Sequence, residues 1–229
     1  MGDVMKKSLF NKTIKDKINE YKKNHLKDFS FKNEEKSFKK ELEKKIKNEQ
    51  IINIDLSNIK INGDILDIGE ENYGIIYTLS KTFDDEVCVD YYEGIESPKD
   101  KEKFDNGILF FNLSKFGILG GRDKLIKQIY DLIIHDGYLY IWDYEKEFKE
   151  IVSTKITVNL PREDKKEFLY KDFNFLNKFK MEDAVKLIEK YFFIEEIKVC
   201  DKIYFIKGKR KGSVKDEGII DSSKLKVYP

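Results

Sequence analysis

Residues 66–81, LDIGEENYGIIYTLSK, have the composition of a turn that can hold the polar end of a nucleotide-like ligand. An apolar run ends in Asp67 and Gly69, and a helical pattern follows from Gly74, which predicts a strand, a tight turn and a helix. Backbone amides at the start of such a helix point outward, and glycines let an anionic or polar ligand approach them. The same residues also suit an ordinary turn, because tight turns favour Gly and Asp in any case.

A further acidic residue, Asp90, ends the apolar run EVCVD about 20 residues after Gly69. An acidic side chain at the tip of the next parallel strand can accept hydrogen bonds from ribose hydroxyls. Asp90 is therefore a candidate ribose ligand. The alternative is a solvated surface acid, which is common after a strand.

The centre of the chain has the pattern of a framework that could position these residues. Short apolar runs alternate with helical patterns at residues 64–68, 74–81, 87–90, 107–113, 122–134 and 138–144. Strands that alternate with helices predict a parallel sheet with both faces covered. Near the end of the chain, two apolar runs flank a tight turn at Asp201 and Lys202, which predicts a closing antiparallel pair.

The flanks of this framework have different patterns. Residues 11–26 and 33–48 carry narrow apolar stripes at helical spacing, which predicts a helical cap within residues 1–60. Three roles are open for these helices: covering the sheet, closing over a ligand, or forming a dimer arm. Pro161 and a charged stretch interrupt the alternation and predict a lid-like insertion at about residues 156–180. We expect an α/β domain over residues 61–210 and a polar tail over residues 211–229.

The bulk composition suits one domain of ordinary size. The chain has 229 residues, of which 40% are hydrophobic and 38% charged, enough to build and cover one core. Its 44 basic and 43 acidic residues leave a net charge of +1, so no overall field indicates a nucleic-acid or anionic-lipid partner. No signal-peptide pattern and no run of roughly 20 apolar residues is seen, which predicts a cytoplasmic protein. Cys88 and Cys200 lie in apolar runs, which predicts reduced, buried thiols without a disulfide or a zinc site.

Four segments, taken in order, resemble the class I S-adenosylmethionine-dependent methyltransferases. ILDIG opens like the family's glycine motif, and VCVDYYE is similar to its second motif. LIIHDGYLYIWD resembles its helix, glycine turn and fifth strand, and FFIEEIKVCDKIYFIKGKR resembles its closing antiparallel pair. The resemblance covers roughly residues 62–210. It implies a Rossmann-like methyltransferase sheet, mostly parallel with a terminal antiparallel strand pair, and S-adenosylmethionine as the cofactor.

The resemblance also implies which residues bind the cofactor. Asp67, Gly69 and Gly74 would form the turn, and Asp90 would hold the ribose. Asn112 stands where amino-methylating members carry Asn or Asp, although the Pro-Pro that follows it in those members is absent here. Catalytic residues are not identified, because methyl transfer depends on positioning the reactants and needs no universal catalytic side chain.

The chain departs from the family's pattern at two places. Glu71 and Tyr73 occupy glycine positions of the turn, and Glu70 and Glu71 would repel the cofactor's carboxylate. A like-charge pair at about 4 Å costs roughly 1 kcal/mol even in water. In addition, residues 91–103 are too few for a helix and a strand, so we expect the third strand to be missing and the sheet to be shortened there.

Two functions are left open. The first is a methyltransferase whose acceptor, a small molecule, a protein or RNA, cannot be assigned. The second is a catalytically inactive, methyltransferase-like binding or interaction protein, which the altered turn and the missing strand favour. A dinucleotide-dependent oxidoreductase would need Gly-x-Gly-x-x-Gly and a fully parallel sheet, and the sequence offers neither. A homo-oligomer is also open, since an exposed sheet edge would suit a partner.

Overall fold

The computed structural model of the chain describes residues 50–69, 73–83, 88–92, 103–116, 121–174 and 176–212. The chain separates into two units, Met1–Glu49 and Gln50–Pro229, and the fold below belongs to the second. The helices expected within residues 1–49, Glu70 and Glu71 of the turn, and the tail from residue 213 onward lie outside the described residues.

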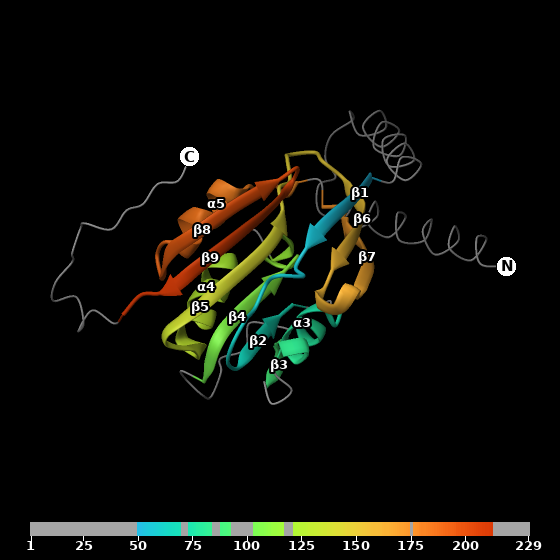
Figure 1. Ribbon diagram of the computed structural model, residues 1–229. Coiled ribbons are helices and arrows are strands. Elements are labelled where there is room, and N and C mark those ends of the chain that lie inside the picture. The colour runs from blue at the N-terminus through green and yellow to red at the C-terminus, as the bar shows by residue number, and fades with distance from the viewer. Residues whose placement is uncertain are drawn as a thin grey trace, which may run out of the picture. The chain divides into compact units, whose positions relative to one another are not determined.

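The larger of two sheets is the mostly parallel sheet that the sequence predicts (Figure 1). Its strands, in spatial order, are β3 (Val89–Tyr92), β2 (Ile65–Ile68), β4 (Phe104–Phe110), β5 (Ile133–Tyr144), β9 (Ile203–Arg210) and β8 (Phe192–Cys200). β2 pairs in parallel with β3 and β4, and β4 pairs in parallel with β5. β9 runs antiparallel to both β5 and β8. The predicted closing antiparallel pair is therefore confirmed, and the short strand β3 forms the edge where the sheet is shortened.

The smaller sheet was not predicted. It joins β1 (Gln50–Asp55), β6 (Val152–Asn159) and β7 (Lys165–Asp172), with β1 parallel to β6 and β6 antiparallel to β7. Most of residues 156–180, which the sequence predicted as a lid-like insertion, lie in the β-hairpin of β6 and β7, with the 3-10 turn η2 (Pro161–Glu163) at its tip. β1 lies within residues 1–60, for which the sequence predicted only a helical cap. Alternate residues of β6 are buried, which is the period-2 pattern of a strand with one covered face.

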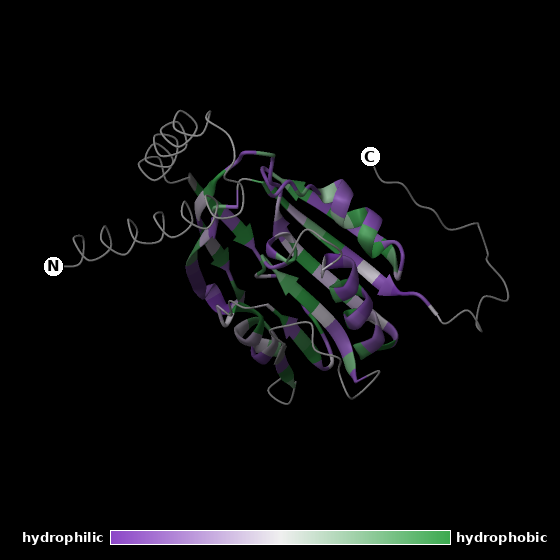
Figure 2. Cartoon of the chain, turned by 180° about the vertical axis from the view of Figure 1, so that it is seen from behind, coloured by the Kyte–Doolittle hydropathy of each residue, from purple (hydrophilic) through white to green (hydrophobic). Residues whose placement is uncertain are grey.

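Two layers cover opposite faces of the large sheet, with α4 (Gly121–Leu132) and α5 (Met181–Ile188) on one face and α3 (Ile75–Phe83) and the small sheet on the other. α4 and α5 contribute to one hydrophobic cluster. Figure 2 shows these two helices from behind, lying across the strands. α3 and the small sheet contribute to the other cluster, which includes Trp142 at 4% exposure. Trp142 is therefore a core residue.

The prediction of buried cysteines is wrong. Cys88 and Cys200 are both free and exposed. Cys88 directly precedes β3 and Cys200 ends β8, the two edge strands of the large sheet. An edge strand has no neighbour on its outer side, so an apolar run there does not guarantee burial. Within the described chain, no helix has the length and apolar content needed to cross a bilayer.

Candidate functional site

The order of the strands creates a switch point between β2 and β4. The chain leaves β2 through α3 to reach β3 on one side, and then returns to β4 on the other side of β2. In open α/β sheets, ligands bind outside the carboxyl ends of the strands at such a point, because the two connections diverge there and leave a crevice. Gly69 follows β2 and Asn112 follows β4, so the topology brings these two predicted site residues to the switch point.

Asn112 joins the two strand ends with its side chain. Its Nδ2 donates to the carbonyl of Phe110 at 2.9 Å and to the carbonyl of Ile68 at 3.2 Å, and the residue is 4% exposed. A Cβ on Gly69 would lie 1.9 Å from Asn112 Nδ2, so only glycine leaves room for this amide. Both residues are thereby explained by packing between the ends of β2 and β4.

Asp67 places a carboxyl group one residue before the end of β2. It lies beside Ile108 of β4 in the register, and it is 8% exposed. Burial raises the pKa of Asp67 to about 7, because the charged carboxylate loses its hydration. Near neutral pH this group is therefore divided between its protonated and ionised forms. A carboxyl group poised in this way responds strongly to a cation that arrives nearby.

Gly74 begins the helix that follows the turn. Its φ of +64° is a left-handed conformation that favours glycine, and its carbonyl accepts hydrogen bonds from both the backbone and the hydroxyl of Thr78. These bonds close the first turn of α3. The structure therefore places Gly74 at the end of the predicted turn.

Asp90 is not brought to the switch point between β2 and β4. β3 continues to Tyr92, and Asp90 lies level with Leu66, three residues before Gly69 along the parallel neighbour. That separation corresponds to about 10 Å along a strand. The carboxylate is 42% exposed and pairs with Lys103 Nζ at 3.1 Å, just before β4 begins. In the sequence, the first acidic residue after β3 is Glu93, which lies outside the described residues.

The hairpin strand β7 reaches the turn and the switch point, which sequence reasoning did not foresee. Its inward side chains alternate with exposed ones and run from Lys166 to Asp172. Lys166 Nζ lies 3.4 Å from where a Cβ on Gly74 would be. Phe168 stacks on Tyr73 with ring centroids 4.0 Å apart, and it meets Phe111 edge-on at 5.5 Å. One strand of the insertion therefore touches both the residues after β2 and those after β4.

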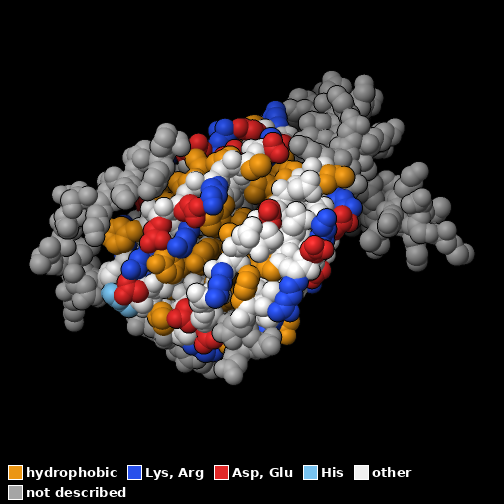
Figure 3. All heavy atoms as spheres, viewed as in Figure 1, with side chains coloured by type: hydrophobic (Ala, Val, Ile, Leu, Met, Phe, Trp, Pro, Cys, Tyr) orange, Lys and Arg blue, Asp and Glu red, His pale blue; other side chains and the backbone are white. Residues whose placement is uncertain are grey.

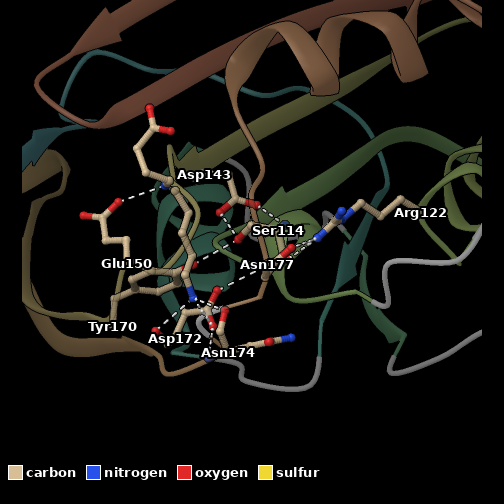
Figure 4. Close-up of polar contacts among 10 residues, drawn as sticks. Ser114, Arg122, Asp143, Glu150, Tyr170, Asp172, Asn174 and Asn177 are labelled. Atoms are coloured by element: carbon tan, nitrogen blue, oxygen red, sulfur yellow. Dashed lines mark hydrogen bonds and ion pairs between the residues drawn. The ribbon is translucent and has the colours of Figure 1, made fainter. Parts of the chain in front are cut away.

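A buried polar network continues along the same side of β7 (Figure 4). Asp143, near the carboxyl end of β5, accepts hydrogen bonds of 2.7 Å from both the backbone amide and the hydroxyl of Ser114. The Ser114 hydroxyl also lies 2.9 Å from the Tyr170 hydroxyl of β7. Burial raises the pKa of Asp143 to about 6, against the opposing effect of these hydrogen bonds. The contacts fix the 3-10 turn η1 (Leu113–Lys115) between the large sheet and the insertion.

A buried ion pair anchors the end of the hairpin. Lys146 Nζ lies 2.6 Å from Asp172 Oδ1, and the side chains are only 1% and 6% exposed. Asn177 donates to Asp172 Oδ2 at 3.3 Å and to the Ser114 carbonyl at 2.8 Å, while Arg122 donates to Asn177 Oδ1 at 2.7 Å. Charged residues this deeply buried are paired and hydrogen-bonded. The hairpin is thus firmly attached to the rest of the domain.

Sequence reasoning missed the partners in this network for a simple reason. Asp143 ends an apolar strand, which is a visible signal, but its partner Ser114 is 29 residues away and Tyr170 is 56 residues from Ser114. Only the fold brings these segments together. Among the described residues, no group of three or more His, Cys, Asp and Glu side chains is arranged to hold a metal ion.

No protein-family model and no curated protein matches this sequence. Among solved structures, the chain is similar to the PH0226 protein from Pyrococcus horikoshii, with 13% identity, a TM-score of 0.45, and coverage of 84% of this chain and 99% of that one. It is also similar to the 1,6-didemethyltoxoflavin-N1-methyltransferase from Burkholderia thailandensis, at 10% identity and TM-score 0.41, over 66% of this chain and 72% of that one. The [4+2]-cyclase SpnF is similar at 10% identity and TM-score 0.43, over 66% and 76%.

Proposed function

We propose that the chain is an S-adenosylmethionine-dependent methyltransferase with its cofactor at the switch point between β2 and β4. The observation that carries the proposal is the large sheet itself, with only β9 reversed and with a strand, turn and helix leading out of β2. That order makes the turn after β2 the expected place for a nucleotide-like ligand. The proposal does not assign the methyl acceptor.

The residues at the switch point suit such a cofactor in their chemistry. The ionised form of Asp67 would favour the positive charges of the sulfonium and the ammonium group. Lys166 would favour the carboxylate at the same end of the ligand, which offsets part of the repulsion expected from Glu70 and Glu71. Lys166 of β7 would therefore supply the positive charge that compensates for the acidic turn.

When bound, S-adenosylmethionine supplies a methyl group attached to a positively charged sulfur. The contribution of the chain is to hold both reactants in line and to keep water out. The network around Asp143 and Ser114 would serve this purpose by fixing the turn after β4 against β7.

A second function, a binding protein without activity, is favoured by one observation. The Tyr73 and Phe168 rings already stack on each other at 4.0 Å beside the start of α3. If these two rings cover the cofactor site, a nucleoside can no longer enter it, as expected of a binding protein that has lost methyltransferase activity.

Isothermal titration distinguishes the two functions. We expect the full chain to bind S-adenosylmethionine and its demethylated product, S-adenosylhomocysteine, at micromolar concentrations. No heat of binding at millimolar ligand would exclude the enzyme and favour the binding protein.

A matched pair of variants locates the ribose. Asp90 lies two residues before the carboxyl end of β3 and pairs with Lys103. Asp90→Ala should therefore leave the affinity for S-adenosylmethionine nearly unchanged. Glu93→Ala should weaken binding by about tenfold, which corresponds to about 1.4 kcal/mol. The reverse result would restore Asp90 as the ribose ligand.

A further inference from the structure

The last strand of the large sheet, β8, has an outer edge with no partner among the described strands. β8 pairs only with β9, and it is nine residues long. Its side chains include three large apolar residues that are strongly exposed: Phe193 at 58%, Ile197 at 41% and Val199 at 52%. An apolar edge strand of this length is a template for pairing with another strand.

The charges on β8 restrict which strand could pair with it. Glu196 and Lys198 share one face of the strand, where they form an exposed ion pair of 2.6 Å. Ile197 and Val199 point to the opposite face, where their partners on β9 are Ile206 and Tyr204. In β8, Ile197 is therefore flanked by the acidic Glu196 and the basic Lys198. When two such segments run antiparallel, each acidic residue can face a basic residue of the other segment.

A second copy of the chain is the partner that satisfies this pattern. Directly opposite residues of an antiparallel pair lie on the same face of the sheet. A two-fold axis between two β8 strands must therefore lie between one residue and the same residue of the other copy. An axis through Glu196 or Lys198 would oppose like charges, which is destabilising. An axis through Ile197 instead places each Glu196 opposite Lys198 of the other copy.

We propose that two copies of this chain pair antiparallel along β8, with the two-fold axis at Ile197, and so join their large sheets into one. Ile197 and Val199 of both copies then gather around the axis on one face, while two Glu196–Lys198 pairs form on the other. The register shift between Ile194 and Glu196 bends the strand, so only a short segment of β8 can pair with the other copy. Because the interface is small, we expect dimerisation to depend on protein concentration.

A charge exchange tests the register. Glu196→Lys alone and Lys198→Glu alone each oppose like charges twice, and sedimentation equilibrium should show about tenfold weaker dimerisation for either variant. The double variant, Glu196→Lys with Lys198→Glu, restores both pairs and should dimerise as the natural chain does. Thermal unfolding of each variant serves as the folding control. A natural chain that stays monomeric at millimolar concentration, or a double variant as weak as the single ones, overturns the proposal.

Cysteine cross-linking tests the axis independently of the charges. In a background with Cys88→Ser and Cys200→Ser, Ile197→Cys brings two thiols directly opposite each other, within the range that a disulfide can span. Mild oxidation should give a covalent dimer on a non-reducing gel. Val199→Cys is the matched control and should not cross-link, because residue 199 faces residue 195 of the other copy. Cross-linking at residue 199 but not at 197 overturns the assigned axis.

Discussion

At the scale of single residues, Asp67 is the most informative group of the site. Its raised pKa means that the folded chain holds a proton more tightly than the unfolded chain does. The stabilising contribution of protonated Asp67 is therefore fully present below the unfolded pKa, near 4, and is lost as the pH rises to about 7. Above that range the folded state retains a buried charge.

We expect Asp67→Asn to remove this pH dependence. In urea unfolding between pH 4.5 and 7.5, the free energy of unfolding of the natural chain should fall relative to the variant by up to about 1.4 kcal/mol per pH unit. Taking the difference cancels the contribution of Asp143, whose raised pKa acts in part of the same range. Parallel curves for the two proteins would show that the pKa of Asp67 is not raised.

The buried pair of Lys146 and Asp172 gives a second prediction at this scale. Lys146→Met leaves a buried carboxylate without its cation and should lower the free energy of unfolding by about 3–5 kcal/mol. The control is Lys155→Met in the same hairpin, since its pair with Glu167 is partly exposed to solvent and should contribute less than about 1 kcal/mol. Equal losses in the two variants would contradict the anchoring role of the buried pair.

At the scale of elements, β7 decides how the site is closed. Three of its inward side chains have partners: Phe168 stacks on Tyr73, Tyr170 lies against Ser114, and Asp172 pairs with Lys146. Lys166 is the inward residue nearest the turn, and no hydrogen bond or ion pair of the described chain engages its ammonium. Under the proposed function, it is the member of this row that would contact the ligand's carboxylate.

Lys166→Met should weaken the binding of S-adenosylhomocysteine by about tenfold, through loss of one charge interaction with the ligand's carboxylate. Binding of 5′-methylthioadenosine, which lacks that carboxylate, should not change. The neighbouring Lys165 points outward and is exposed, so Lys165→Met is the control for overall charge. Titration calorimetry of both ligands measures the effect, and an equal loss for both ligands would rule out a carboxylate contact.

At the scale of the whole molecule, the two hydrophobic clusters share one set of strands. Ile108 of β4 belongs to one cluster and Leu109, its neighbour, to the other. The small sheet therefore cannot detach without exposing one face of the large sheet. We expect unit Gln50–Pro229 to unfold in a single cooperative transition.

The fully buried Ile156 of the small sheet tests this coupling. Ile156→Ala should destabilise the whole unit by about 2–5 kcal/mol. Trp142 lies in the large sheet, so its fluorescence and the far-ultraviolet circular dichroism should report the same midpoint, shifted equally. An early circular-dichroism transition that leaves Trp142 unaffected would show that the small sheet unfolds separately.

The sequence by itself determined the elements whose signals are local. The strand at Asp67, the helix after Gly74 and the reversed final pair each depend on periodicity and turn residues within a few positions, and the structure has all three. Asp90 shows the limit of such signals, because the end of a strand is set by pairing with its neighbour, and β3 runs on to Tyr92.

Only the tertiary structure decided what surrounds the site. The pairing of β1 with β6 joins residues about a hundred positions apart, and neither strand carries a mark of its partner. The same is true of Ser114 with Tyr170 and of Lys166 with Gly74. Partner choice depends on burying matching apolar faces and satisfying buried polar groups across the whole domain, which no local pattern encodes.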